Sequence, residues 1–291
     1  MTTDTPPRPP NAAVAIVTVS YNSGRYLAEF LASTYAASTG STRVVVADNA
    51  SRDEAEARRI TEAAGAIFLP MGSNRGYGYA VNRAVETLPP AVEWVLISNP
   101  DVVLEPGSVD ELLRVGAAEP TVGAVGPAIQ EPDGEYYPSA RQLPSLRNGL
   151  GHALFANIWP SNPWTRRYRR EGQHDAVRST GWLSGACVLV RRSLFDALGG
   201  FDEEYFMYFE DVDLGFRITR AGYRNLYQPA ARVMHVGAHA TRESSDQMRR
   251  AHHRSAYRFL ALKYSGWYLA PLRWVLGIGL GVRSRLPRRT P

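Results

Sequence analysis

Short apolar runs rich in β-branched residues alternate with amphipathic segments along the first 125 residues. The runs predict strands at 14–19, 43–47, 66–69, 94–98 and 122–125. Between them, apolar residues recur with helical period and predict helices at 25–37, 52–64, 79–88 and 108–119. Strands that alternate with helices are typical of a mostly parallel sheet with crossover helices, so the pattern predicts an α/β fold.

The second half of the chain is less regular. Residues 130–178 hold five prolines and predict loops and short helices, including the basic run 166–170. A strand at 182–191, a helix from Ser193 and a helix from the acidic cluster 210–213 to Arg220 are expected next. We therefore divide the chain into a disordered tail (1–12), an α/β domain (13–240) and a basic, amphipathic, helical region (241–291).

Composition narrows the class of protein. The chain has 291 residues, is 44% hydrophobic and contains one cysteine, Cys187, which excludes an internal disulfide and a cysteine-based zinc site. The first ten residues include four prolines and no apolar core of a signal peptide. Since no uninterrupted apolar run reaches the roughly 18 residues of a membrane span, we expect a cytoplasmic protein.

Charge is concentrated at the carboxyl end. The net charge is +5, and the chain from Gln247 onward holds ten basic residues and no acidic one. Interrupted apolar sequence at 267–282 fits an interfacial segment on an anionic leaflet, with Trp267 and Trp274 at the headgroups. Equally, the same segment fits a helix that packs on the α/β domain or on a second subunit. A nucleic-acid groove is not expected, because the strand-end motifs are acidic and amide-rich.

Polar clusters follow the first two predicted strands. Thr18 to Asn22 ends the first, and Asp48 and Asn49 end the second. Asp48 can accept the ring N–H of uracil or thymine, while Thr18 and Asn22 can meet a ribose or phosphate. Turn formation and helix capping explain the same residue types, so both interpretations stay open at this point.

Two further clusters follow the third and fourth strands. The glycines of 72–78 permit close approach of a ligand, and Arg75 offers a cation for a diphosphate. Pro100 ends the fourth strand and presents Asp101 as an oxygen ligand for a divalent ion. That ion would neutralise a nucleoside diphosphate as a leaving group. An aspartate in an ordinary turn is the alternative.

Glu210, Asp211 and Asp213 crowd three carboxylates into four residues among aromatic side chains. Such crowding raises at least one pKa, which suits a general base, although acidic residues also favour helix N-termini. His235 ends another apolar run, and a neutral imidazole there can serve as a second metal ligand beside Asp101. A polar residue that simply ends a strand is the alternative.

Taken in order, these motifs resemble those of the inverting glycosyltransferases of family 2, which have the GT-A fold. The matching segments are VTVSYNS (17–23), DNAS (48–51), NRGYG (74–78), NPD (99–101), WLSGA (182–186) and FEDVDL (209–214). Within the family, the similarity is greatest to bacterial rhamnosyltransferases that act on polyprenyl-diphosphate-linked N-acetylglucosamine.

The resemblance implies a role for each motif. Asp48 would bind the base, Asp101 and His235 would hold Mn²⁺ or Mg²⁺, and Asp211, with Glu210 beside it, would deprotonate the acceptor. Acceptor contacts are expected from Trp182, Ser184 and Gly185. Donor contacts are expected from Thr18, Ser20, Tyr21, Asn22, Asp48, Asn49, Asn74, Arg75, Gly76, Asn82 and Asn99.

One position departs from the family pattern. The first acid of the usual DXD motif is Asn99 here, which increases the expected importance of His235. The implied activity is transfer of L-rhamnose from dTDP-rhamnose to a lipid-linked acceptor in cell-wall or surface polysaccharide assembly, at the inner face of the membrane. A galactofuranosyl or other hexosyl transferase that uses a UDP-sugar, and a non-catalytic sugar-nucleotide-binding protein, are the alternatives.

Overall fold

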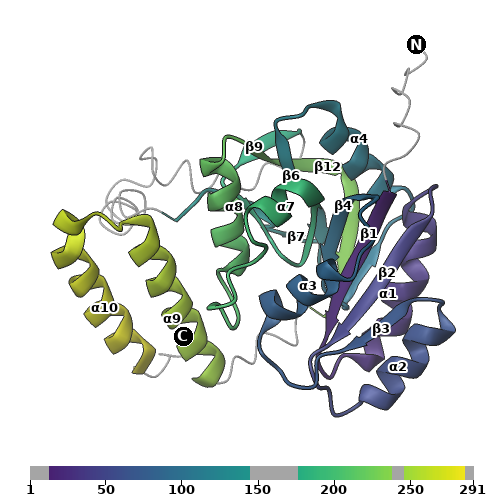
Figure 1. The fold of residues 1–291 in the computed structure, drawn as a ribbon, viewed down its shortest axis with the longest axis horizontal. Helices are drawn as coiled ribbons and strands as arrows, with labels where there is room; N and C mark the ends of the chain where they lie inside the picture. The colour runs from purple at the N-terminus through teal and green to yellow at the C-terminus, as the bar shows by residue number, and fades with distance from the viewer. Residues whose placement is uncertain (1–12, 145–175, 238–245, 286–291) are drawn as a thin grey trace.

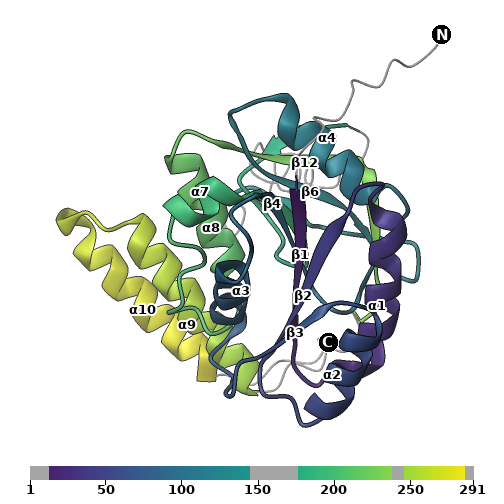
Figure 2. The same ribbon diagram turned by 45° about the vertical axis from the view of Figure 1, so that its right-hand side comes forward.

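The computed structural model describes residues 13–144, 176–237 and 246–285 (Figure 1). Its centre is a ten-stranded sheet in the order β3-β2-β1-β4-β11-β6-β12-β5, with β7 beside β6 and β9 beside β12. Helices cover both faces of this sheet (Figures 1 and 2), and the predicted α/β class is confirmed. The predicted tail 1–12, the basic run 166–170 and the domain boundary at 240 lie outside the described residues.

Four parallel strands form one half of the sheet, as the sequence pattern predicts. They are β1 (Ala13–Ser20), β2 (Thr42–Asp48), β3 (Ile67–Pro70) and β4 (Val92–Ser98). The crossover helices are α1 (Gly24–Ala37), α2 (Glu54–Ala63) and α3 (Tyr77–Glu86). Because parallel strands are covered on both faces, their sequences are almost continuously apolar.

The other half of the sheet mixes strand directions. Its strands are β5 (Val102–Leu104), β6 (Val122–Gln130), β7 (Tyr136–Tyr137), β9 (Arg178–Thr180), β11 (Cys187–Arg191) and β12 (Arg224–His235). Its helices are α4 (Ser108–Ala118), α7 (Arg192–Ala197) and α8 (Glu210–Arg220). Strand β11 runs antiparallel to both β4 and β6, whereas β12 is parallel to β6 and antiparallel to β5.

The single strand predicted at 182–191 is wrong, because the chain turns in its middle. Residues Trp182–Leu183 form β10, which pairs with β8 (Ala140–Arg141), and the sheet strand β11 begins only at Cys187. Between them, the Ser184 N–H donates to Ser139 O and the Gly185 N–H to Asp211 Oδ2. Because these two N–H groups bond outside the sheet, they cannot pair with a neighbouring strand. Residues 184–186 therefore form a turn at the edge of the candidate site.

Alternate residues of β1 separate the core into two layers. Ile16 packs with buried residues of α1 and α4, whereas Val17 packs with buried residues of α3, α7 and α8. Burying a side chain of this size contributes about 1.5–3 kcal/mol. The two-sided core therefore fixes the register of the central strands, and with it the edge at which their polar ends meet.

Two further helices lie on the α8 side of the molecule, one next to α8 and the other outside it (Figures 1 and 2). They are α9 (Asp246–Lys263) and α10 (Ala270–Arg285), joined by the short helix η2 (Trp267–Leu269). Phe259 of α9 is completely buried in a cluster with Tyr205 and Val212, and Arg258 forms an ion pair of 2.7 Å with Asp202. No helix in the described ranges is long and apolar enough to cross a membrane.

Candidate active site

The carboxyl ends of β1, β2 and β4 meet at one edge of the sheet. In register, Ser20 lies beside Asp48 and Thr18 beside Ser98. This edge is where ligands bind in open α/β sheets. The structure therefore brings together the clusters that the sequence placed after these three strands.

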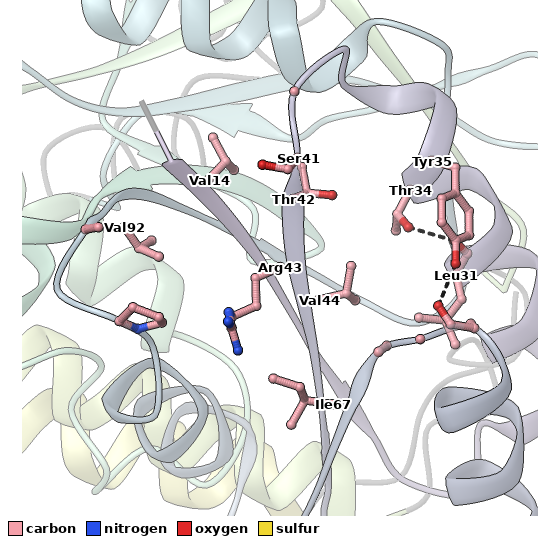
Figure 3. A pocket seen from close by; sticks show the side chains of 16 residues that line it. Val14, Leu31, Thr34, Tyr35, Ser41, Thr42, Arg43, Val44, Ile67 and Val92 are labelled. Atoms are coloured by element: carbon pink, nitrogen blue, oxygen red, sulfur yellow. Dashed lines mark hydrogen bonds between the residues drawn. The ribbon is translucent and has the colours of Figure 1, made fainter. Parts of the chain in front are cut away.

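A separate hollow of about 680 Å³ lies at the opposite edge of the sheet. Figure 3 shows Arg43 projecting into it, near Val14, Val44 and Ile67, from the amino ends of the strands. None of the residues predicted for donor, metal or acceptor binding lines this hollow. The candidate site is therefore the polar edge and not this cavity.

Asp48 and Ser51 organise the first part of the site. The buried Asp48 carboxylate accepts the Ser51 N–H at 2.9 Å and the Ser51 hydroxyl at 2.6 Å. Asn22, in left-handed backbone at φ 55°, accepts the Arg52 N–H through Oδ1 and donates its own N–H to Ser51 Oγ. These bonds lock two strand-end turns together, and Tyr21 stands exposed beside them.

Several buried polar atoms at this edge have no hydrogen-bond partner among the described residues. They are Thr18 Oγ1, Ser20 Oγ and Asn49 Oδ1, whereas Asn49 Nδ2 donates to Gly76 O at 3.1 Å. Because burial without a partner is costly, unsatisfied groups of this kind are a mark of ligand sites. Their predicted contacts to a donor stay predictions.

The segment Asn74–Arg75–Gly76 turns over the amino end of α3. Asn74 Oδ1 accepts the Gly76 N–H at 3.1 Å, and Gly76 has a φ of 105°. A Cβ at Gly76 would lie 2.5 Å from Phe206 O, so only glycine fits. The exposed Arg75 guanidinium stacks 4.0 Å above the Tyr79 ring.

Asn82 holds α3 to the loop that precedes α8. Its Nδ2 donates to Phe201 O at 2.9 Å and to Glu203 Oε1 at 3.1 Å, and its Oδ1 accepts the Phe201 N–H. These bonds give Asn82 a structural part that the sequence interpretation did not include. Its predicted donor contact stays a prediction.

Asp101 and His235 meet although 134 residues separate them. Their Oδ1 and Nε2 atoms are 3.1 Å apart, because β5, which follows Asp101, pairs antiparallel with the end of β12. The Asn99 N–H donates to Ala186 O at 2.9 Å and anchors the turn. No group of three or more metal-ligating side chains occurs in the described ranges. A carboxylate with an imidazole thus fits a divalent ion whose remaining ligands are diphosphate and water oxygens.

Gly237 is a site residue that the sequence interpretation missed. A Cβ at this position would lie 2.1 Å from Asp101 Oδ2, and the preceding Val236 N–H donates to Asp101 O at 2.9 Å. The absence of a side chain therefore allows the Asp101 carboxylate to rest against the chain after β12. A glycine two residues after His235 is the only sequence signal for this contact.

The substitution Gly237→Ala is expected to weaken Mn²⁺-dependent binding of a nucleoside diphosphate about tenfold, because the new methyl group displaces the Asp101 carboxylate. Calorimetric titration measures this affinity, and Gly279→Ala in α10 is the control, because no atom lies within 4 Å of a Cβ at that position and neither Gly279 nor Gly237 has a positive φ. A Gly237→Ala affinity equal to that of the wild type would refute the positioning role.

Glu210 and Asp211 begin α8 in unlike environments. Asp211 Oδ2 accepts the Gly185 N–H at 3.0 Å and its Oδ1 the Val212 N–H at 2.8 Å. Burial raises the pKa of Asp211, and these backbone bonds oppose that rise. Glu210 Oε2 has no partner in the described chain, and burial, then the Asp211 charge, raises the pKa of Glu210 to about 8. At neutral pH we therefore assign the negative charge to Asp211 and a proton to Glu210.

Tyr77 connects these carboxylates to the acceptor-side turn. Its hydroxyl donates to Gly185 O at 3.0 Å. Burial raises the pKa of Tyr77 well above its usual value, and the charges of Glu210, Asp211 and Asp101 raise it further. The Tyr77 phenol is therefore within electrostatic reach of the acid pair and of Asp101.

The remaining residues predicted to contact the acceptor lie on this turn and on the preceding strand β10. Ser184 Oγ accepts the Ala186 N–H at 3.3 Å, and the Trp182 indole N–H donates to Gln142 O at 3.2 Å. Together with Gly185 they place the predicted acceptor residues next to Asp211. Tyr77 is the residue here that sequence reasoning missed.

Backbone strain precedes the acid pair. Tyr208 and Phe209 both have left-handed backbone, with φ of 67° and 69°, which bulky residues rarely adopt and which costs about 1–3 kcal/mol per residue. Helix α9 holds the turn, since Ser255 Oγ donates to Met207 O at 2.9 Å and the Phe209 ring packs against His252 and Phe259.

The protonated state of Glu210 has a measurable consequence. Because its folded pKa, about 8, exceeds the unfolded value near 4.5, the fold binds this proton more tightly, and stability falls as pH rises from about 5 to 9. We expect the melting temperature of Glu210→Gln to fall less over that range, while its turnover at pH 7 stays within about tenfold of the wild type. If the melting temperatures of the two proteins fell by the same amount between pH 5 and pH 9, the assignment of a proton to Glu210 would be contradicted.

The polar strand ends, the Asp101–His235 pair and the buried acid pair lie where the resemblance to GT-A glycosyltransferases implies them. Residues 9–258 match the family described as "Glycosyltransferase like family 2". The chain belongs to glycosyltransferase family 2, as predicted.

Two curated relatives are rhamnosyltransferases. The chain is 46% identical over 284 residues to the N-acetylglucosaminyl-diphospho-decaprenol L-rhamnosyltransferase of Mycobacterium tuberculosis, covering 94% of this chain and 92% of that protein. It is 27% identical to rhamnosyltransferase WbbL of Escherichia coli K12, covering 76% and 83%.

A solved structure shares the fold. The mannosyltransferase PcManGT from Pyrobaculum calidifontis, in complex with GDP-Man and Mn²⁺, has a TM-score of 0.59 and 19% identity, covering 93% of this chain and 70% of that one. The predicted GT-A fold is therefore confirmed.

Proposed function

We propose that this enzyme transfers L-rhamnose from dTDP-rhamnose to a hydroxyl of a polyprenyl-diphosphate-linked N-acetylglucosamine, in cell-wall or surface polysaccharide assembly. The observation that carries the proposal is 46% identity over 94% of the chain to an enzyme named for rhamnosyl transfer to such an acceptor. A lipid-linked acceptor places the enzyme at the cytoplasmic face of the membrane as a peripheral protein.

In this proposal, the strand-end residues hold the donor. Asp48 accepts the ring N–H of thymine, and the unpartnered Thr18 and Ser20 hydroxyls face the nucleoside or diphosphate. Asp101 and His235 hold the divalent ion, which when bound neutralises the leaving diphosphate. An imidazole ligand favours Mn²⁺ over the harder Mg²⁺.

Asp211 is the proposed general base. Backbone N–H groups of Gly185 and Val212 orient its carboxylate, so that it takes the proton of the acceptor hydroxyl as that oxygen attacks the anomeric carbon. The new C–O bond forms as the bond to the diphosphate breaks on the opposite face. Configuration inverts, and no covalent enzyme intermediate is needed.

A donor screen tests the proposal. The full chain is incubated with Mn²⁺, polyprenyl-diphosphate N-acetylglucosamine and, in separate reactions, dTDP-rhamnose, UDP-galactofuranose, UDP-glucose or GDP-mannose. Mass spectrometry of the acceptor is expected to show addition of one deoxyhexose from dTDP-rhamnose alone. Transfer only from a UDP-sugar would overturn the donor assignment, and binding without any transfer would favour a non-catalytic protein.

A further inference from the structure

The carboxyl-terminal helices carry an unusual number of exposed apolar side chains. Trp267, Tyr268, Trp274, Val275 and Ile278 are between 67% and 86% exposed. Large aromatic and β-branched residues with this much exposure, gathered in twelve consecutive positions, are typical of a surface that contacts an apolar partner.

The spacing places the α10 members of this set on one face. Trp274, Val275 and Ile278 follow the i, i+1, i+4 pattern of a single helical stripe. The opposite face contacts α9, where a Cβ at Gly277 would lie 3.1 Å from the Tyr257 ring. We call the stripe of Trp274, Val275 and Ile278 the α10 apolar face.

Hydrogen bonds fix the direction of this face. Arg273 Nη1 donates to Tyr264 O at 2.8 Å and to Gly266 O at 2.7 Å, tying the start of α10 back to the end of α9. In both ribbon views α10 lies outside α9, on the side away from the sheet (Figures 1 and 2). The α10 apolar face is therefore held outward by the fold.

The positive charge of the carboxyl-terminal segment indicates what kind of surface the α10 apolar face contacts. From Gln247 onward the chain has ten basic residues and no acidic one, and Arg250 and Arg254 of α9 are exposed. An apolar stripe that includes Trp274, on a segment of the chain whose charged residues are all basic, matches the acyl boundary and anionic headgroups of a membrane surface. A second copy of this chain would bring two strongly positive regions together, which like-charge repulsion disfavours.

We propose that the α10 apolar face docks on an anionic lipid surface. This inference rests on the proposed function, because a polyprenyl-linked acceptor is presented at such a surface. Helix α9 packs on α10 and also holds the turn before the acid pair through Ser255 and Phe259. Docking through α10 thus keeps Asp211 at a fixed position relative to the membrane.

Vesicle co-sedimentation of the full chain tests the proposal. Vesicles of phosphatidylcholine with phosphatidylglycerol are compared with pure phosphatidylcholine. The triple variant Trp274→Gln, Val275→Gln, Ile278→Gln is expected to lose about tenfold or more in partitioning to anionic vesicles, because three apolar side chains no longer insert. The matched control is Ile67→Gln with Val177→Gln, two partly exposed apolar residues elsewhere, and it should bind as the wild type does.

Salt dependence provides a second measurement that needs no variant. Wild-type binding to anionic vesicles is expected to fall when NaCl rises from about 0.05 to 0.5 M, since screening shortens the reach of the arginines. Equal binding to neutral and anionic vesicles, or equal binding of the triple variant, would overturn the proposal. A wild-type dimer in light scattering that the triple variant converts to monomer, with vesicle binding unchanged, would assign the face to a second copy.

Transfer to two acceptors separates this proposal from the proposed function. With a short-chain, water-soluble acceptor the triple variant should transfer sugar at the wild-type rate, whereas with acceptor in anionic vesicles its rate should fall about tenfold. If the wild type used neither acceptor, the proposed function would fail. If both proteins used both acceptors equally, only the docking surface would fail.

Discussion

Replacing Asp211 by Asn is expected to lower kcat by about 10²–10⁴-fold, because an amide cannot take the proton of the acceptor hydroxyl. The amide oxygen can still accept the Gly185 N–H, whereas the hydrogen bond from the Val212 N–H to the second oxygen is lost. The loss costs about 1–3 kcal/mol, so the fold should persist with lower stability. Steady-state transfer assays give kcat, and titration with dTDP should give an affinity within about twofold of the wild type.

Two companion variants sharpen this test. Asp196→Asn changes a carboxylate whose ion pair lies on the surface, with Arg192, and should leave kcat unchanged. Glu210→Gln should retain far more activity than Asp211→Asn, because Glu210 already carries a proton at neutral pH. Equal turnover of Asp211→Asn and the wild type, or a reversed order of the two acid-pair variants, would refute the base assignment.

Replacing Asp101 by Ala is expected to abolish the Mn²⁺ dependence of nucleoside-diphosphate binding and to lower kcat/KM by about 10²-fold or more. The carboxylate is one of the two protein ligands that we propose for the ion, and His235 Nε2 lies 3.1 Å from it. Isothermal titration of dTDP with and without Mn²⁺ measures the effect directly.

Replacing His235 should weaken metal binding less than replacing Asp101. We expect His235→Ala to weaken Mn²⁺ binding while retaining some metal dependence, because Asp101 and the diphosphate still contribute oxygen ligands. Asp133→Ala, on an exposed loop, is the control. An unchanged metal titration in Asp101→Ala would exclude the carboxylate as a ligand.

The parallel half of the fold was predictable from the sequence because of its burial. Strands β1 and β4 lie between two helical layers, so their residues are apolar almost without interruption and end abruptly at polar turns. Their carboxyl ends must share an edge, so Thr18, Asp48 and Asp101 could be assigned to one site before any geometry was known.

The mixed half was less predictable, because its order depends on tertiary contacts. Nothing local signals that β11 inserts between β4 and β6, or that Ser184 and Gly185 interrupt the predicted strand. The left-handed Tyr208 and Phe209 oppose local preference, and α9 stabilises them across some fifty residues of chain. Backbone preferences read from the sequence therefore fail at Tyr208 and Phe209, which directly precede the acid pair. The strained backbone there sets the position at which α8 and its two acidic residues begin.

The anomeric configuration of the product distinguishes a single displacement from a double one. Transfer from isotopically labelled dTDP-rhamnose to a short-chain acceptor is followed by the one-bond carbon–proton coupling at the anomeric carbon. A single displacement with Asp211 as base predicts a product whose configuration is opposite to that of the donor. A product that retains the donor configuration would rule out a single displacement and, with it, the role of Asp211 as the base.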